Sequence, residues 1–274
     1  MRLHRFYIAQ KVGNNEEVTI SDADLIHQLL NVFRFKVGDS IIVFDGTGFE
    51  GKAEIVSASR TEVILSLAKT VVPVLAESPR EYHLTDRNFV SLYLSLIKKN
   101  NFELAAEKCT EIGVAEIHPV ISLRSEKKDL NIPRLEKIVK EASEQSGRLS
   151  LPEVFEITDL ESAVLLAKKN NKMCVAFHTG ELNCDSATER GYDEAGQILV
   201  EKVAVFVGPE GGWTEKEMKL FTENNFQVCS LGHNILRAET AAITAVWEAF
   251  HRGWFYFIFS SHSKTFSLVS IIST

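Results

Sequence analysis

The chain has 274 residues, of which 45% are hydrophobic and 24% charged, and its formal net charge is −7. These values are typical of a soluble globular protein, and the length suits one large domain or two smaller ones; we expect two. The negative charge argues against avid nonspecific binding of nucleic acid, although a local basic patch could still contact phosphates.

The four cysteines are scattered along the chain and have neither the spacing of a zinc site nor that of a disulfide framework. They are Cys109, Cys174, Cys184 and Cys229. The N-terminus lacks the apolar core of a secretory signal, and no stretch approaches the ~20 apolar residues that span a bilayer. We therefore expect a cytoplasmic protein that binds no metal and no membrane.

Residues 1–72 have the pattern of a small β domain. Short apolar or alternating runs predict strands at 5–9, 16–20, 39–45, 51–58 and 62–68. Between the first strands, Ser21 or Asp22 can cap a helix. Its apolar face would hold Leu25, Ile26, Leu29, Leu30 and Phe33. Residues 73–87 are predicted to be a linker.

From residue 88 to 252, strands alternate with helices. Strands are predicted at 89–97, 115–121, 154–157, 173–177, 203–207 and 226–232, and helices at 101–113, 131–147, 159–171, 214–221 and 239–251. The alternation predicts an α/β domain with a mostly parallel sheet covered on both faces. The apolar tail, residues 253–274, could add a strand, cover a dimer surface or be a poorly constrained extension.

Three predicted strands end in polar or glycine-rich loops, at 178–181 (HTGE), 208–212 (GPEGG) and 231–240 (LGHNILRAET). Ligands of α/β sheets bind beyond the carboxyl ends of the strands, so we expect these loops to form one site. The chain contains neither GxGxxG nor GxxxxGK[ST], which disfavours a dinucleotide or a triphosphate. Glu210 disfavours a phosphate as well and favours a cationic or hydroxyl-rich ligand.

Several motifs, in this order along residues 1 to about 250, resemble the RsmE family of SPOUT-class ribosomal RNA methyltransferases. They are MRLHRFYI, GDSIIVFDGTG, EKCTEIGVAEIHPV, EASEQSGR, VGPEGGWTEKE and LGHNILRAETA. The resemblance implies an N-terminal PUA-like β-barrel for RNA and a C-terminal SPOUT domain with a trefoil knot. It further implies a homodimer that uses S-adenosyl-L-methionine to methylate N3 of a specific uridine in small-subunit (16S) ribosomal RNA.

The resemblance also assigns the knot loops to the cofactor. The residues it implies are Gly208, Pro209, Glu210, Gly211, Gly212, Leu231, Gly232, Ile235, Leu236, Arg237 and Thr240, with Thr179 a further candidate on the remaining loop. Asn234 stands where a basic residue is common in the family, and Ala238 where threonine is common. Glu210 could instead be a helix N-terminal charge, and Arg237 could instead bridge to Glu239 or a carbonyl.

Methylation of uridine N3 requires loss of a weakly acidic imide proton, and therefore a base or a cation that stabilises the anion. In the EASEQSGR motif, Glu144 is our candidate for deprotonation and Arg148 for charge stabilisation. The alternative is an exposed ion pair at the end of a helix, since residues four apart share a helix face.

Basic side chains at two places could contact RNA phosphates, although such residues often only solvate a surface. They are Arg2, Arg5, Arg34 and Lys36 in the small domain, and Arg124, Lys127 and Lys128 after a strand. Two other functions stay open: a SPOUT methyltransferase acting on another RNA position, and a noncatalytic RNA-binding factor of ribosome assembly.

Overall fold

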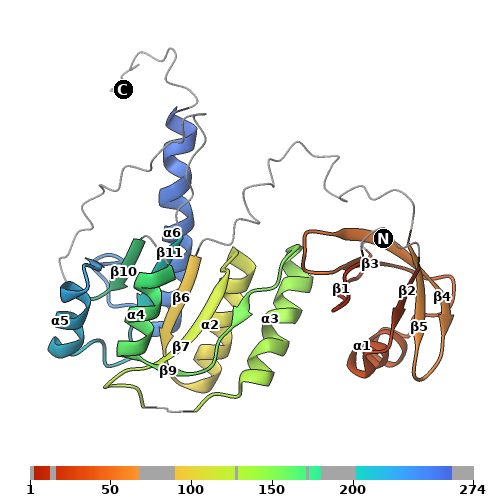
Figure 1. The fold of residues 1–274 in the computed structure, drawn as a ribbon, viewed down its shortest axis with the longest axis horizontal. Helices are drawn as coiled ribbons and strands as arrows, with labels where there is room; N and C mark the ends of the chain where they lie inside the picture. The colour runs from red at the N-terminus through yellow and green to blue at the C-terminus, as the bar shows by residue number, and fades with distance from the viewer. Residues whose placement is uncertain are drawn as a thin grey trace, which may run out of the picture. The chain divides into compact units, whose positions relative to one another are not determined.

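A computed structural model describes residues 3–12, 17–67, 90–126, 129–170, 173–179 and 202–260, with the backbone alone for 251–260 (Figure 1). The predicted linker 73–87 lies outside these ranges. The chain divides into two compact units. The N-terminal unit comprises Met1–Asn88 and Pro133–Glu153, and the second unit comprises Phe89–Ile132 and Val154–Thr274.

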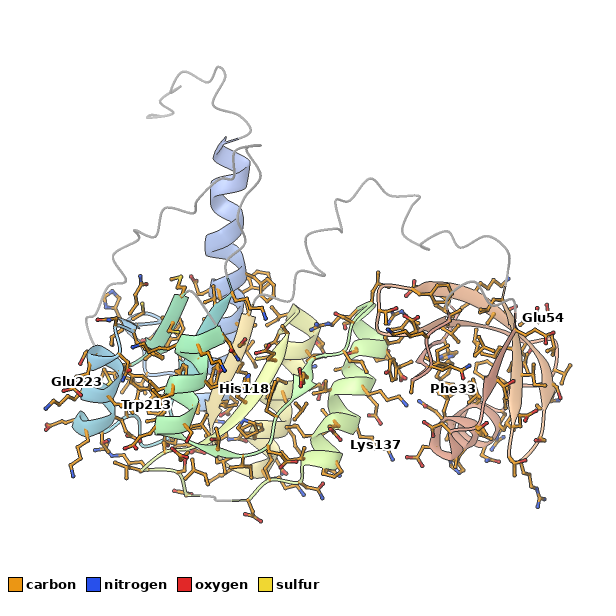
Figure 2. All side chains as sticks on the ribbon, in the orientation of Figure 1. Phe33, Glu54, His118, Lys137, Trp213 and Glu223 are labelled. Atoms are coloured by element: carbon orange, nitrogen blue, oxygen red, sulfur yellow. The ribbon has the colours of Figure 1, made fainter. Side chains whose placement is uncertain are left out.

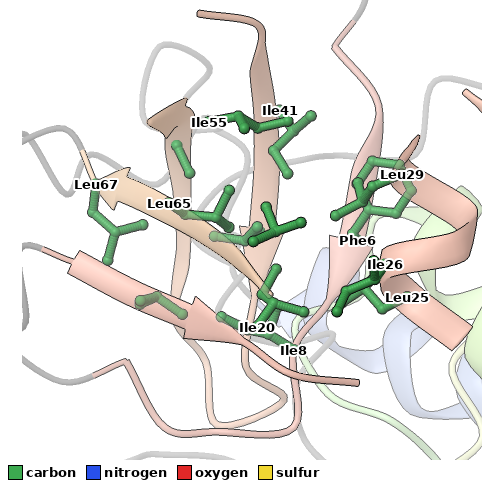
Figure 3. Close-up of a cluster of buried hydrophobic side chains, with 14 of the residues drawn as sticks. Phe6, Ile8, Ile20, Leu25, Ile26, Leu29, Ile41, Ile55, Leu65 and Leu67 are labelled. Atoms are coloured by element: carbon green, nitrogen blue, oxygen red, sulfur yellow. The ribbon is translucent and has the colours of Figure 1, made fainter. Parts of the chain in front are cut away.

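The N-terminal unit is built on a five-stranded sheet with the order β1-β3-β4-β5-β2. The strands are β1 (Arg5–Tyr7), β2 (Glu17–Ile20), β3 (Ser40–Phe44), β4 (Glu50–Ala58) and β5 (Val63–Leu67). β1 pairs with β3 in parallel, and the other neighbours are antiparallel. Alternate strand residues, among them Ile41, Ile55 and Leu65, point into one hydrophobic core (Figure 3). All five predicted strands are confirmed.

The predicted helix between β2 and β3 is shorter than its apolar pattern suggested. The side chain of Asp22 accepts hydrogen bonds from the amides of Asp24 and Leu25 at 2.9 and 3.2 Å and so begins α1 (Ala23–His27). The chain then widens into a π-helical segment, η1 (Gln28–Val32). Of the predicted apolar face, Leu25, Ile26 and Leu29 are buried, and Leu30 and Phe33 pack partly buried against the same core.

Helix α3 (Ile132–Ser146) differs from the predicted domain boundaries, which put it in the second domain. Residues 133–153 instead group with the N-terminal unit. The reason is a set of contacts with β1: the amide of Tyr7 donates to Glu144 at 3.0 Å, and the guanidinium of Arg5 donates to the carbonyl of Ser143 at 3.0 Å. Sequence periodicity finds a helix but not the sheet it packs on.

The second unit holds a mostly parallel sheet, in which β6, β7, β9, β10, β11 and β12 pair in parallel, and this confirms the predicted α/β fold. Its order is β12-β10-β11-β6-β7-β8, with β9 paired to β7. The strands are β6 (Val90–Ser95), β7 (Glu116–Ile121), β8 (Glu153–Val154), β9 (Thr158–Asp159), β10 (Met173–Phe177), β11 (Val203–Val207) and β12 (Gln227–Cys229). The helices are α2 (Lys99–Ile112), α4 (Leu160–Asn170), α5 (Glu215–Glu223) and α6 (Ala238–Ser260). The trefoil knot stays a prediction.

Central strands β6 and β11 are buried at every position, as expected for a parallel sheet covered on both faces. One face carries a row of stacked rings. His118 of β7, which is labelled in Figure 2, lies between Phe155 and Tyr93, and its ring centroid is 4.0 and 4.1 Å from theirs. Tyr93 stacks in turn on Phe206 at a centroid distance of 4.3 Å. α4 and α5 complete this core.

Two sequence expectations need correction. α6 does not end near His251 but continues as backbone helix to Ser260, so the first part of the tail extends this helix. Between residues 252 and 260, Gly253 is the one residue with a low helix propensity, and a single glycine destabilises a helix by only about 1 kcal/mol. Although the cysteine spacing predicted no disulfide framework, Cys229 is disulfide-bonded, whereas Cys109 and Cys174 are free.

Within the described ranges, no helix has the length and apolar character needed to cross a membrane. The same residues contain no group of three or more histidine, cysteine or carboxylate side chains suited to hold a metal ion.

Candidate functional site

The three strand-end loops singled out in the sequence line one pocket of about 700 Å³ in the second unit. The strand register explains why they meet: Phe177, the last residue of β10, is level with Val207 of β11 and with Cys229 of β12. Because three adjacent parallel strands end at one level, the residues that follow them leave the sheet together. The predicted convergence of the loops is therefore found.

The glycine-rich loop after β11 is a tight turn closed by Trp213. The amide of Gly212 donates to the carbonyl of Pro209 at 2.8 Å, and Gly212 has a positive φ of 66°. The indole of Trp213 folds back over Gly208, where an added Cβ would lie only 3.1 Å from the ring. Position 208 therefore requires glycine because the indole ring packs against it. Position 212 favours glycine because the turn has left-handed backbone there.

Thr214 and Glu217 form the capping box predicted from their spacing. The hydroxyl of Thr214 accepts from the amide of Glu217 at 3.3 Å, and the Glu217 carboxylate accepts from the amide of Thr214 at 2.7 Å. The other carboxylate oxygen of Glu217 accepts from the amide of Leu123 at 2.8 Å. The cap thus fixes the end of the glycine loop and also ties it to the turn after β7.

Glu210 lies at the beginning of α2. Its Oε1 accepts a hydrogen bond from the amide of Lys98, the N-cap residue of this helix, at 3.3 Å. The Lys98 side chain makes no capping hydrogen bond, so the carboxylate supplies the negative group favoured at a helix N-terminus. The alternative interpretation of Glu210 is thus supported, although Glu210 also lines the pocket and is exposed.

The loop after β12 carries an exposed cation. Arg237 lines the pocket, and its side chain makes no ion pair with any residue of the described ranges. The predicted alternative partner, Glu239, is buried and accepts instead from the amide group of Asn101 at 3.3 Å. The suggested Arg237–Glu239 bridge is therefore absent, and the guanidinium is available to a ligand.

Most of the residues implied by the resemblance line the pocket. They are Thr179, Gly208, Pro209, Glu210, Gly211, Gly212, Leu231, Gly232, Ile235, Leu236 and Arg237. Thr240 is not among the lining residues; it is exposed in the first turn of α6. Asn234 and Ala238, where the chain departs from the family pattern, both line the pocket.

Sequence reasoning missed Lys98 and Asn101, which line the pocket from the loop after β6 and the start of α2. β6 is the neighbour of β11 in the sheet. The strand-end rule would have found both residues had it been applied to this strand as well. Trp213 was quoted in the glycine motif but not identified as a pocket residue.

The predicted catalytic residues lie in the N-terminal unit. Glu144 is only 6% exposed, and burial raises the pKa of its carboxyl group. It is therefore not the exposed helix-end carboxylate that the alternative interpretation supposed. The backbone carbonyl of Arg148 accepts a hydrogen bond from the guanidinium of Arg5.

The predicted RNA-binding residues have different environments. Arg5 is nearly buried: its guanidinium pairs with Glu50 and lies 3.7 Å from the centre of the Phe44 ring. Arg34 and Lys36 are exposed, and Arg34 has a positive φ of 59°. Arg124 is exposed but donates to the glycine loop. Arg2, Lys127 and Lys128 lie outside the described residues.

Comparisons with known proteins agree with this geometry. The family model for an RNA methyltransferase domain matches residues 85–248, and that for an RNA methyltransferase PUA domain matches residues 20–68. The ribosomal RNA small subunit methyltransferase E of Rickettsia conorii is 30% identical, over 90% of this chain and 94% of the relative. The Bacillus subtilis protein of that name is 32% identical, over 81% of this chain and 85% of the relative.

A solved structure is similar over nearly the whole chain. It is the ribosomal RNA small subunit methyltransferase E of Neisseria gonorrhoeae, described as bound to S-adenosyl methionine. The TM-score is 0.73 at 27% identity, and the match covers 90% of this chain and 96% of the other.

Proposed function

The chain belongs to the RsmE family of ribosomal RNA small subunit methyltransferases, and on that premise we propose that it methylates N3 of a specific uridine in 16S ribosomal RNA. S-adenosyl-L-methionine would supply the methyl group. The observation that carries the proposal is the pocket where the loops after β10, β11 and β12 meet. The similar Neisseria gonorrhoeae enzyme, solved with S-adenosyl methionine, supports the choice of cofactor.

The chemistry of the pocket suits this cofactor, which carries a sulfonium, an ammonium and a carboxylate. At Gly212 no atom of the described residues, apart from its two chain neighbours, lies within 4 Å of where a Cβ would stand, so a ligand can approach the backbone of the loop there. Glu210 offers a negative charge to the cationic groups, and the free guanidinium of Arg237 offers a partner to the carboxylate. A pocket with both signs of charge and exposed backbone fits a zwitterionic nucleoside better than a polyphosphate.

For the proton on uridine N3, Glu144 remains the proposed base and Arg148 the proposed cation. The raised pKa of Glu144 supports this role, because a carboxylate accepts a proton more readily near neutral pH when its pKa is raised. Methyl transfer by Glu144→Gln and Arg148→Ala variants tests the assignment. Wild-type rates in both would remove these residues from the mechanism.

For RNA, we propose contacts from Arg34 and Lys36, whose side chains are exposed, together with Arg2 and Lys127. Arg5 is left out because its guanidinium already has partners in its own chain. We further propose that the protein acts as a homodimer in the cytoplasm, and light scattering after gel filtration would measure the dimer mass directly.

The decisive experiment incubates the protein with small ribosomal subunits that lack the modification and with S-adenosyl-L-methionine carrying a ¹³C-methyl group. The RNA is then digested, and its nucleosides are compared with a 3-methyluridine standard by mass spectrometry. Labelled 3-methyluridine is the expected product, and Arg237→Ala should form it more slowly. Heat-denatured protein provides the blank.

The same experiment separates the two alternatives. Label in another nucleoside would identify a methyltransferase of different position specificity. A protein that binds RNA but neither takes up the cofactor in calorimetry nor transfers the label would be a noncatalytic assembly factor.

A further inference from the structure

The turn after β7 contacts the glycine loop from outside the pocket. The guanidinium Nη1 of Arg124 donates to the carbonyl oxygens of Gly211 at 2.7 Å and of Trp213 at 3.5 Å. The aliphatic part of the same side chain packs on Gly211, where an added Cβ would lie 3.2 Å from Cδ of Arg124. Arg124 is not itself a lining residue of the pocket.

A second contact joins the same turn to the helix that follows the loop. Glu217, 4% exposed, accepts from the amide of Leu123 through one oxygen and from the amide of Thr214 through the other, at 2.8 and 2.7 Å. The turn itself is closed by Ser122 and Ser125, whose hydroxyl oxygens are 2.9 Å apart. The turn is therefore the donor in both contacts: the Arg124 guanidinium donates to the loop, and the Leu123 amide donates to a buried carboxylate of α5.

We infer that Arg124 is a positioning residue for the methyl-donor pocket, holding the glycine loop in its binding shape rather than contacting RNA. This inference rests on the proposed function. The charged guanidinium of Arg124 holds the carbonyl groups of Gly211 and Trp213, which a flexible glycine loop would otherwise turn toward water. Hydrogen bonds from charged donors are stronger than those between neutral groups. The loop is thus ordered before the cofactor arrives, which lowers the entropic cost of binding.

Calorimetry of S-adenosyl-L-methionine binding, without RNA, tests the inference. We expect Arg124→Ala to raise the dissociation constant about tenfold, and Arg124→Lys, which keeps the charge but is shorter and lacks the guanidinium, to fall between it and wild type. Lys216→Ala is the matched control, since it removes an exposed cation from the adjacent helix α5, and it should bind like wild type.

Turnover separates positioning from damage to the fold. In Arg124→Ala the KM for S-adenosyl-L-methionine should rise about tenfold, while kcat at saturating cofactor stays within about twofold of wild type. A lower kcat at unchanged KM, as expected from a smaller folded fraction, would overturn the inference. Wild-type cofactor affinity combined with weakened binding of small-subunit RNA would overturn it too and make Arg124 an RNA contact. Failure of the wild-type protein itself to bind the cofactor would instead contradict the proposed function.

Discussion

The indole Nε1 of Trp213 donates a hydrogen bond of 2.9 Å to the carbonyl oxygen of Phe177. This bond joins the glycine loop after β11 to the last residue of β10, so two walls of the pocket are held by one side chain. The ring itself is buried and packs edge-on against Phe221 at a centroid distance of 4.9 Å.

Trp213→Phe should therefore loosen the pocket while largely preserving the core. We expect the free energy of unfolding to fall by about 2–3 kcal/mol, because one hydrogen bond and part of a buried ring are lost, and the affinity for S-adenosyl-L-methionine to fall as well. Urea unfolding and calorimetry measure the two effects. Phe221→Leu, which disturbs the same core but keeps the donor, is the control; an equal loss of affinity in both variants would contradict the role of the bond.

Glu210→Gln separates charge from hydrogen bonding. Glutamine keeps an acceptor for the Lys98 amide, so the start of α2 should stay capped and the melting temperature should change little. If the carboxylate faces the sulfonium, affinity for S-adenosyl-L-methionine should fall severalfold more than affinity for S-adenosylhomocysteine, whose sulfur is neutral. Equal losses for the two ligands would restrict Glu210 to its role at the helix.

Arg5→Ala should destabilise the N-terminal unit. The side chains of Arg5 and Glu50 are only 10% and 7% exposed, so removing the cation leaves a nearly buried carboxylate unpaired. We expect a loss of about 3 kcal/mol in the free energy of unfolding, measured with urea. Lys36→Ala, at an exposed site, should change stability by less than about 0.5 kcal/mol. Similar small effects for both variants would return Arg5 to the set of RNA contacts.

The burial of Glu144 predicts that the difference in unfolding free energy between Glu144→Gln and wild type depends on pH. Burial, the largest cause, raises the pKa of Glu144 above its ordinary value of 4.5 in the folded protein. The folded state then holds this proton more tightly than the unfolded state, so the associated stability is present at low pH and lost as pH rises through the folded pKa. The variant should therefore gain stability relative to wild type as pH rises from about 4.5 through the range in which the folded-state carboxyl group loses its proton.

Urea unfolding at several pH values within this window measures the difference. Glu136→Gln, exposed on the same helix, should show no such trend. A difference between Glu144→Gln and wild type that does not change with pH would mean that burial of this carboxylate is not coupled to its protonation.

The sequence predicted local structure and the pocket loops well, because each depends on patterns within a few residues. The period-two runs became β1 to β5, and the Thr214–Glu217 spacing became a capping box. The strand-end rule also selected the right loops, since β10, β11 and β12 end in register.

What the sequence did not predict depends on contacts between distant residues. Nothing in the local pattern of Arg5 indicates that it meets Ser143 and Arg148, more than 100 positions away, so its internal contacts were not predicted. The contact between Arg124 and Gly211 was missed for the same reason, because the two residues are distant along the chain. The cofactor and RNA roles of the remaining residues are still predictions.

The N-terminal unit is formed by two separate stretches of the chain, and this limits how its parts can be exchanged with those of other proteins. Because residues 133–153 belong to it, the chain passes between the units at three points rather than one. A chimera that exchanges only residues 1–72 would leave a foreign sheet facing α3, whose Leu135, Val139 and Ala142 are buried. Grafting the N-terminal unit onto another enzyme therefore requires two segments to be transplanted together.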